Sequence, residues 1–532
     1  NRMNQAELLV ILLAAVIAGG LVAKRLSQPY PIVFVIGGVA LAFFPDLPHW
    51  KLDPDRFFLI VLPPMLFSGA WATDWYAFKR NLRSISLLAV GLVLFTAAAI
   101  AWLAHDVAGL PWPLAFALGA IVAPPDPVAA EAIFERLSVP ARIVTILTGE
   151  GLVNDATALV IYRFAVAAAV AGTFAAQHAA FSFIIVAAGG ISVGIFCGIL
   201  IERVLRFLRL RDLNDSTLVT VVVLLAPYAA YLPAEAIDVS GVLATVSAGI
   251  YLSRRSATIL DSESRIVGSS VWNVMTFLLN AFVFLAIGLQ LRPILDSMRV
   301  SPGGFAFDAA IVSVAVVLLR FVWIFPATYL PRLLSRRIRE SEPEPSWQAV
   351  TLVGYAGMRG IVSLAAALAL PYTKANGAPL AGRALVIVIT LAVIFVTLVG
   401  QGLTLAPLIR LLGLSETSSS QKRETGVRIR ALEAGLARLH QLESGFSSSV
   451  EWETAGRLLR EYEDRIEHLR GHLEDEDRSE EREESTIDHR LQAVALSAER
   501  KEILRLRGAG EIPDDVYRRI EYDLDLAALR LN

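Results

Sequence analysis

Long apolar runs with almost no charge fill the first 414 residues of this chain, and they constrain its fold more than any other feature. A helix needs about 20 mostly apolar residues to cross the hydrocarbon core of a bilayer. Breaks at Pro, Gly and charged residues divide the segment into thirteen such runs, which predict an all-α polytopic membrane protein. The predicted spans are 6–23, 30–44, 56–71, 82–104, 112–137, 143–171, 181–208, 215–231, 239–254, 269–291, 304–330, 347–371 and 383–412.

The distribution of charge divides the chain into two domains. Overall, 18% of the residues are charged, but residues 415–532 hold 19 basic and 27 acidic groups in 118 positions. Residues 1–414 hold the other 29 basic and 23 acidic groups, about 13% of that segment. A soluble globule is normally about a quarter charged. The sequence therefore predicts a membrane domain over 1–414 and an aqueous tail over 415–532.

Composition also argues against several classes of protein. A net charge of −2 offers no basic footprint for nucleic acid. The one cysteine, Cys197, excludes an intramolecular disulfide. The membrane part shows no buried cluster of His, Cys or other metal ligands, and no spacing typical of a nucleophile with its base. We therefore expect neither an enzyme nor a resident cofactor.

Basic residues flank the spans unequally, and this bias predicts orientation. The loops after spans 1, 3, 5, 7, 9 and 11 carry 18 Lys and Arg residues, whereas the other six loops carry 6. Because basic loops are retained on the cytoplasmic side, we expect the N-terminus outside and the tail in the cytoplasm. Lys24 and Arg25 follow the first span, which favours a retained span over a cleaved signal peptide.

Two predicted spans are interrupted at mid-membrane depth. The fifth contains Ala123-Pro124-Pro125-Asp126-Pro127, and the twelfth contains the Gly-rich segment 354–360. Prolines remove backbone donors and free the carbonyls of residues 123–125. Such breaks persist in a bilayer only where protein or a water-filled cavity satisfies the backbone. We interpret them as crossed broken helices of an inverted repeat, spans 1–6 and 8–13. The alternative is a pair of ordinary Pro and Gly kinks.

Ionisable residues inside the spans are candidates for function, because an unpaired charge in the bilayer is costly. On the sixth span, Glu150 and Asn154 share one helix face, whereas Asp155 points about 140° away from Glu150 at 100° per residue. Gly151 lacks a side chain one turn before Asp155 and is expected to leave room there for water or an ion. The central candidates are Asp126, Glu150, Asp155, Arg320 and Arg359, and Glu131 and Arg163 are less central.

The carboxylates are expected to have different roles. Glu150 is predicted to pair with a buried arginine. Asp155 has no evident cationic partner and could hold either a proton or a cation, with Asp126 and the freed carbonyls as further oxygen ligands for Na⁺ or K⁺. A structurally paired Asp is the alternative for either carboxylate. Arg359 either balances the carbonyl end of a half-helix or takes part in transport.

The tail is predicted to be helical. Leu432, Leu436 and Leu439 follow a spacing typical of a short coiled-coil seam, as do the apolar residues of 462–473. An acidic linker over 474–484 and a helical hairpin over 488–531 are expected to follow. We expect the tail either to dimerise or stabilise the protein, or to regulate the membrane domain.

Three motifs together resemble the monovalent cation/proton antiporter-1 family of sodium/proton exchangers. They are Gly149-Glu150-Gly151-Leu152-Val153-Asn154-Asp155, Pro125-Asp126-Pro127-Val128 and Gly357-Met358-Arg359-Gly360. The resemblance covers about residues 6–412. It departs from the family at Pro125 and Gly151, where Thr and Ser are common, and this leaves open which cation is moved.

The resemblance implies a secondary antiporter of the plasma (inner) membrane that serves pH homeostasis as a homodimer. Asp155 would be the shared cation/proton site, Asn154 would mark the electroneutral branch, and Glu150 would pair with Arg320. Na⁺ exchange for H⁺ is the expected activity, with K⁺ or Li⁺ as alternatives. A cation channel is the competing class, although no repeated filter segment around a pore axis is visible.

Overall fold

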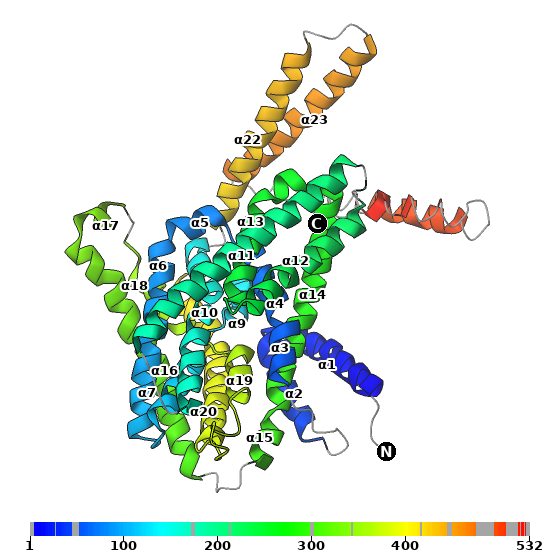
Figure 1. Cartoon of the computed structure of the whole chain (residues 1–532). Helices are drawn as coiled ribbons and strands as arrows, with labels where there is room; N and C mark the ends of the chain where they lie inside the picture. Colours follow the sequence, from blue (N-terminus) through cyan, green and yellow to red (C-terminus); the bar gives the residue numbers. More distant parts are fainter. Residues whose placement is uncertain are drawn as a thin grey trace. The chain divides into compact units, whose positions relative to one another are not determined.

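The computed structural model divides into two compact units, Asn1–Glu416 and Thr417–Asn532. It describes residues 5–26, 28–44, 53–171, 176–211, 213, 215–297, 303–341, 344–414, 418–443, 449–474 and 494–506, with isolated positions 516, 520–521, 523–525 and 527. Helices make up nearly all of the regular structure in these ranges (Figure 1). The all-α prediction is therefore confirmed.

Helices lie over all thirteen predicted ranges of the first unit. Those of its first half are α1 (Gln5–Leu26), α2 (Tyr30–Ala42), α3 (Pro54–Ile60), α4 (Leu62–Ala72), α5 (Trp75–Arg80), α6 (Leu82–Ser86), the π-helix η1 (Leu87–Leu92), α7 (Val93–Asp106), α8 (Trp112–Val122), α9 (Val128–Leu137) and α10 (Ala141–Ala171). The second half holds α11 (Ala176–Leu210), α12 (Ser216–Ala236), α13 (Gly241–Ile259), α14 (Ser262–Leu289), α15 (Leu291–Ser297), α16 (Gly303–Leu334), α17 (Arg336–Ser341), α18 (Trp347–Tyr355), α19 (Ile361–Leu368), α20 (Arg383–Phe395), η2 (Val396–Gln401) and α21 (Gly402–Leu411).

Seven of the helical segments in the described residues are long and apolar enough to cross a membrane. They are Leu82–Asp106, Ala141–Ala171, Phe183–Leu210, Ser216–Ala236, Ser262–Asp296, Phe305–Leu334 and Arg383–Leu411. Shorter apolar helices cover Tyr30–Ala42, Arg56–Ala72 and Trp112–Val122. The chain is a multi-pass membrane protein, while the number of thirteen crossings and the inverted repeat stay predictions.

Polar side chains fix where several helices begin. Asp74, Asp215, Ser240, Asp261 and Ser346 each precede a helix and accept a hydrogen bond from a backbone N–H of its first turn. These N–H groups have no partner inside the helix, so a side-chain oxygen at the cap stabilises the start by about 1 kcal/mol. The caps fix the residue at which each of the helices α5, α12, α13, α14 and α18 begins.

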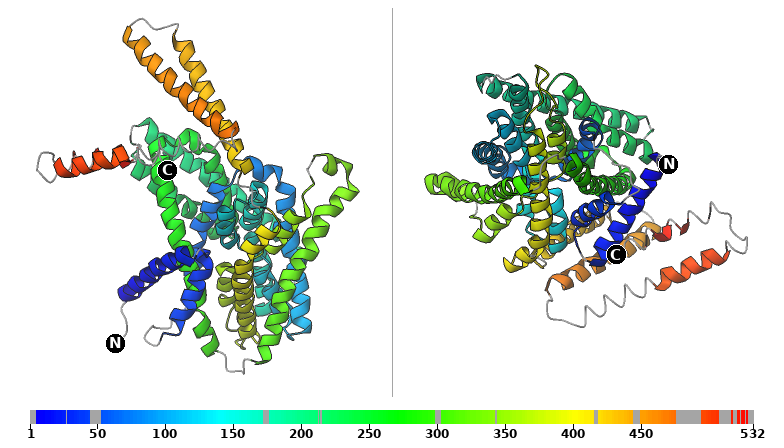
Figure 2. Two further views of the ribbon diagram at one scale, coloured as in Figure 1. Left: turned by 180° about the vertical axis from the view of Figure 1, so that it is seen from behind. Right: turned by 90° about the horizontal axis from the view of Figure 1, so that it is seen from below.

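Both predicted breaks are confirmed. The fifth span consists of α8, which ends at Val122, and α9, which begins at Val128. The twelfth consists of α18, which ends at Tyr355, and α19, which begins at Ile361. Helices α8 and α19 pack together, and the long helix α16 packs along α7, α18 and α20 (Figure 2). This packing brings segments far apart in sequence to the middle of the unit.

In the second unit, α22 (Ser418–Glu443) and α23 (Ser449–Glu474) form an antiparallel hairpin (Figure 2). Ile429 of α22 and Leu459 and Ile466 of α23 are buried, and Tyr462 packs against Gly435. Leu432, Leu436 and Leu439 are half-buried. The helices predicted at this seam are therefore confirmed. Apart from Glu474, which ends α23, the predicted acidic linker lies outside the described residues. Most of the second predicted hairpin also lies outside them; residues 494–506 of it are helical.

Candidate carboxylate site at the two helix breaks

The two helix breaks contact each other directly. The backbone N–H of Asp126, in the first break, donates to the carbonyl of Met358, in the second, at 2.6 Å. This bond replaces a helical bond that the break removes, because each buried backbone group needs a partner. The contact places the α8–α9 and α18–α19 breaks side by side.

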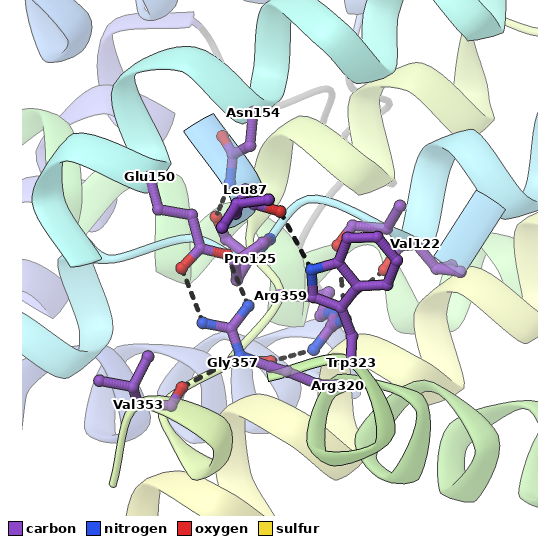
Figure 3. Close-up of polar contacts among 11 residues, drawn as sticks. Leu87, Val122, Pro125, Glu150, Asn154, Arg320, Trp323, Val353, Gly357 and Arg359 are labelled. Atoms are coloured by element: carbon purple, nitrogen blue, oxygen red, sulfur yellow. Dashed lines mark hydrogen bonds and ion pairs between the residues drawn. The ribbon is translucent and has the colours of Figure 1, made fainter. Parts of the chain in front are cut away.

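A buried ion pair lies beside the breaks. The guanidinium of Arg320 on α16 donates from Nη1 and Nη2 to the two carboxylate oxygens of Glu150 on α10, at 2.6 and 2.7 Å (Figure 3). Both side chains are 1% exposed. Arg320 Nε donates to the carbonyl of Val353 at 3.2 Å, in the last turn of α18. The pair is bidentate, which is the strongest arrangement of Arg with a carboxylate.

Arg359 contacts the carbonyl end of α8. Its Nε donates to the carbonyl of Val122 at 2.9 Å and its Nη2 to that of Ala123 at 3.4 Å (Figure 3). A third bond joins its Nη1 to the carbonyl of Gly357. These carbonyls carry the partial negative charge of a helix C-terminus. Of the two roles considered for Arg359, the contacts favour the charge balance of a half-helix.

The groups that the two buried arginines contact nearly balance their charge. Arg320 and Arg359 bring two positive charges, and Glu150 brings one negative charge. The C-terminal ends of α8 and α18 add about half a negative charge each. Arg320 contacts the end of α18 and Arg359 the end of α8. This balance allows two arginines to be buried in the middle of a membrane protein.

Asn154 satisfies a carbonyl freed by the first break. Its Nδ2 donates to the carbonyl of Pro125 at 2.9 Å, and the side chain is fully buried (Figure 3). Its Oδ1 has no hydrogen-bond partner in the structure. Since Arg359 holds the carbonyl of Ala123, two of the three predicted free carbonyls have protein donors. Asn154 contacts the first break but does not line the cavity that is described next.

Asp126 and Asp155 line one cavity of about 80 Å³. Both are half-buried, whereas Glu150 and Asn154 are fully buried. Asp126 Oδ1 accepts the N–H of Val128 at 3.0 Å at the start of α9. Among the described residues, Asp155 forms no ion pair with a basic side chain. A cavity of this size has room for several water molecules, since one water needs about 10–15 Å³ on this scale.

Gly151 does not leave open space beside Asp155, so that expectation was wrong. A Cβ at Gly151 would lie 2.4 Å from Cγ of Pro127. The ring of Pro127 fills the volume that the missing side chain provides, so Gly151 permits the unwound segment to approach α10. A serine is common at this position in the family that the sequence resembles, and here its side chain would require Pro127 to move. The cavity itself is bounded by Gly151 and Pro127 and by residues of α4 and α19.

Gly360 is required for the position of Asp126. A Cβ at this residue would lie 1.8 Å from Oδ2 of Asp126. We expect Gly360→Ala to displace the carboxylate and to lower the exchange activity that the resemblance implies by roughly tenfold or more, since tenfold corresponds to only about 1.4 kcal/mol. The measurement is the cation-driven proton flux that such an activity would give in proteoliposomes. Gly400→Ala is the matched control, because nothing lies within 4 Å of its Cβ position. Equal loss in both variants would contradict this role.

The less central candidates have partners that the sequence analysis missed. Glu131 accepts a hydrogen bond from the hydroxyl of Thr148, and both residues line the carboxylate cavity. Arg163 pairs with Glu235 of α12 at 2.8 Å. Glu235 could have been suspected as an acidic residue at a span end, whereas Thr148 carries no signal in the sequence.

Thr397 of η2 is a further contact of the second break. Its hydroxyl oxygen accepts the backbone N–H of Arg359 at 3.1 Å. The same hydroxyl donates to the carbonyl of Val393 at 2.8 Å, within its own helix. Hydroxyls commonly bond a preceding helix carbonyl in apolar surroundings. Nothing in the sequence distinguishes this Thr from the others in apolar spans.

Comparison with known proteins adds to this geometry. A family model described as sodium/hydrogen exchanger, transmembrane, matches residues 10–411. A protein of Bacillus pumilus named sodium, potassium, lithium and rubidium/H(+) antiporter is 35% identical over 406 residues, which are 74% of this chain and 60% of that protein. The uncharacterized Na(+)/H(+) exchanger YjcE of Escherichia coli is 31% identical over 94% of this chain and 93% of its own length.

A solved structure supports the fold. The sodium proton antiporter MjNhaP1 of Methanocaldococcus jannaschii, determined at pH 8, aligns with a TM-score of 0.58 and 19% identity. The alignment covers 76% of this chain and 98% of that one. The described part of this chain thus shares its helical architecture with a known membrane transporter.

Proposed function

This chain belongs to the sodium/hydrogen exchanger family, and we propose that it exchanges Na⁺ for H⁺ across the plasma membrane, with Asp155 as the shared binding site. Members of this family are secondary transporters and not enzymes. The membership rests on a match to residues 10–411 and on a relative 31% identical over nearly its full length. The choice of cation, the site and the stoichiometry are our proposals.

One observation carries the assignment of the site. Asp155 and Glu150 lie on the same helix, yet Glu150 is buried in a bidentate ion pair and Asp155 faces a cavity without such a partner. A carboxylate whose charge is already balanced by an arginine attracts a cation only weakly. A carboxylate beside a small hydrated space can bind either a proton or a hard monovalent cation. The environment therefore favours Asp155 over Glu150 as the transporting group.

The proposed chemistry is a competition at one carboxylate. Na⁺ would bind to the oxygens of Asp155, with Asp126 and cavity water completing its shell. A proton arriving from the other side of the membrane would displace it. The described residues contain no group of three or more His, Cys, Asp or Glu side chains that could hold a metal. Glu131 also lines the cavity but accepts a hydrogen bond from Thr148, so the proposed carboxylate ligands are Asp126 and Asp155. Two carboxylate ligands suit a weakly held monovalent cation better than a tightly held divalent ion.

Alternating access requires α10 to move relative to part of the protein. We infer that the broken helices move with α10, because Asn154 of α10 donates to the carbonyl of Pro125 in the first break. The N–H of Asp126 then joins the first break to Met358 of the second. The pair of Arg163 on α10 with Glu235 on α12 would then separate in each cycle. A homodimer would supply a fixed partner for this motion. We also propose that the N-terminus lies outside the cell and that the tail lies in the cytoplasm.

Electroneutral exchange is the second part of the proposal. It is supported by the neutral Asn154 beside Asp155 and by the absence of lysine from the predicted spans. One negative site that exchanges one H⁺ for one Na⁺ moves no net charge.

In proteoliposomes containing a pH-sensitive dye, Na⁺ should drive proton flux at a rate that changes less than about twofold under an imposed membrane potential of 100 mV. Moving one net charge would be worth about 2.3 kcal/mol there, or roughly fiftyfold. A steep voltage dependence would contradict electroneutrality.

K⁺ or Li⁺ exchange is the alternative within the same mechanism. The printed name of the Bacillus pumilus relative includes potassium, lithium and rubidium, which favours broad selectivity. Pro125 and Gly151 provide no side-chain hydroxyl. Fewer fixed ligands would therefore select among cations by size. Flux compared for Na⁺, K⁺ and Li⁺ in the same vesicles separates the alternatives. Cation uptake without proton counterflow would indicate a channel and contradict the proposal.

A further inference from the structure

Two large apolar cavities lie along α10, away from the carboxylate cavity. One of about 450 Å³ is lined by residues of α5, α10, α11 and α13, and the other of about 530 Å³ by residues of α7, α8, α10 and α11. They share Thr157, Val160 and Phe183. Neither is lined by Asp126 or Asp155. We call the two cavities together the α10–α11 groove.

The length of the groove matches the depth of a lipid chain. Its lining residues on α10 run from Val153 to Ala168, which is about 22 Å at 1.5 Å per residue. The hydrocarbon core of a bilayer is about 30 Å thick. Each cavity falls within the range of about 300–1,000 Å³ that is usual for sites of small organic ligands. An apolar space of this size inside the hydrocarbon region suits an acyl chain and not an ion.

One end of the groove carries groups suited to an anionic headgroup. The guanidinium of Arg254, which lines the first cavity, lies 5.0 Å from the ring centroid of Trp75. Arg254 is exposed, and no ion pair with a carboxylate is found for it among the described residues. Trp75 and Phe78 of α5 line the same cavity, and the exposed Lys79 follows them directly. Aromatic and basic residues at one level are typical of a membrane interface.

The charge at this end identifies the class of lipid. The loops that carry Lys79 and Arg254 are among the basic ones that we predict to be cytoplasmic. Basic pockets between helices on that side bind anionic lipids. A zwitterionic headgroup would bring its own positive charge to Arg254. A headgroup with a net negative charge would be complementary to it.

We propose that an anionic phospholipid of the cytoplasmic leaflet binds in the α10–α11 groove, with its phosphate on Arg254 and one acyl chain along Val160 and Phe183. Its chain separates α10, which carries Asp155, from α11. Few residues of α10 and α11 touch each other directly, so the lipid would form much of the contact between them. Binding itself does not depend on the proposed exchange. Its effect on transport does, because the lipid lies where α10 would have to move.

Binding is tested on the full chain, delipidated in detergent, by native mass spectrometry and thermal unfolding with added phosphatidylglycerol or phosphatidylcholine of equal chain length. We expect phosphatidylglycerol to bind at least fivefold more tightly and to raise the unfolding temperature more. Arg254→Gln should weaken phosphatidylglycerol binding about fivefold, which corresponds to one basic contact. Arg211→Gln is the matched control, since Arg211 lies over the ring of Phe207 at 5.6 Å and lines neither cavity.

A second variant tests the acyl chain. Ala187 lines the first cavity, and Ala187→Phe would fill part of it without changing charge. We expect this variant to weaken binding of long-chain phosphatidylglycerol and to leave that of a dihexanoyl analogue unchanged. Equal binding of the two headgroups, or an equal effect of Arg254→Gln and Arg211→Gln, would overturn the proposal. Because no transport is measured, failure here would leave the proposed exchange untouched.

Discussion

Asp155→Asn is expected to abolish cation-driven proton flux while the protein still folds and inserts. The amide has nearly the same shape as the carboxylate, but it neither takes up a proton in this pH range nor attracts a cation with a full charge. At an effective dielectric constant of about 20, a unit charge 4 Å from a cation is worth about 4 kcal/mol. This corresponds to a loss of roughly a thousandfold in cation affinity. Flux is measured in proteoliposomes with a pH-sensitive dye.

Asp106→Asn is a suitable control for this experiment. Asp106 is an exposed residue at the end of α7, and it does not line the carboxylate cavity. The control should keep nearly normal flux, which separates loss of the site from loss of a surface charge. Gel filtration and the unfolding temperature establish that both variants are folded. Na⁺-dependent proton flux retained by folded Asp155→Asn would refute the assignment of the site.

The largest effect on stability is expected at the ion pair of Glu150 with Arg320. Both side chains are 1% exposed, so removal of either one leaves the other as an unpaired charge inside the protein. Breaking a buried pair in this way typically costs about 3–5 kcal/mol. Arg320→Ala would also release the carbonyl of Val353 at the end of α18. We expect Glu150→Ala and Arg320→Ala to fold poorly, measured as the yield of monodisperse protein and its unfolding temperature.

The pair of Arg163 with Glu235 offers a matched control. Its side chains are 50% and 32% exposed, and the N···O distance of 2.8 Å resembles that of the buried pair. Exposed ion pairs contribute about 0–1 kcal/mol. Arg163→Ala should therefore change the unfolding temperature little. If Arg163→Ala and Arg320→Ala destabilised the protein equally, burial would not be the cause of the effect.

Much of the fold was predictable from local sequence. Apolar runs of membrane length predicted where helices lie, because in a bilayer each backbone polar group must be satisfied within its own segment. The breaks were predictable for the same reason: prolines at 124, 125 and 127 remove donors, and three glycines surround Arg359. The helix ends were less predictable, since caps such as Asp261 act within one turn of the boundary.

The contacts of the site were only partly predictable. The resemblance implied the pairing of Glu150 with Arg320, 170 residues apart, whereas composition and periodicity implied only that some arginine was needed. The role of Gly151 was misjudged, because a missing side chain in a sequence does not reveal what fills its place. Pro127 fills it, through a turn of the unwound segment that no local rule specifies.

By itself, the sequence determined that this chain is a helical membrane protein with two broken helices and a few buried charges. These features follow from the solvation of single segments, which depends on neighbouring residues in the chain. Only the tertiary structure decided which charges neutralise one another and which one faces a cavity. Glu150 and Asp155 are five residues apart and chemically alike, yet Arg320 of α16 forms a buried pair with Glu150, whereas Asp155 faces a small cavity. That difference is set by the distant helices around each carboxylate, and a local pattern cannot contain it.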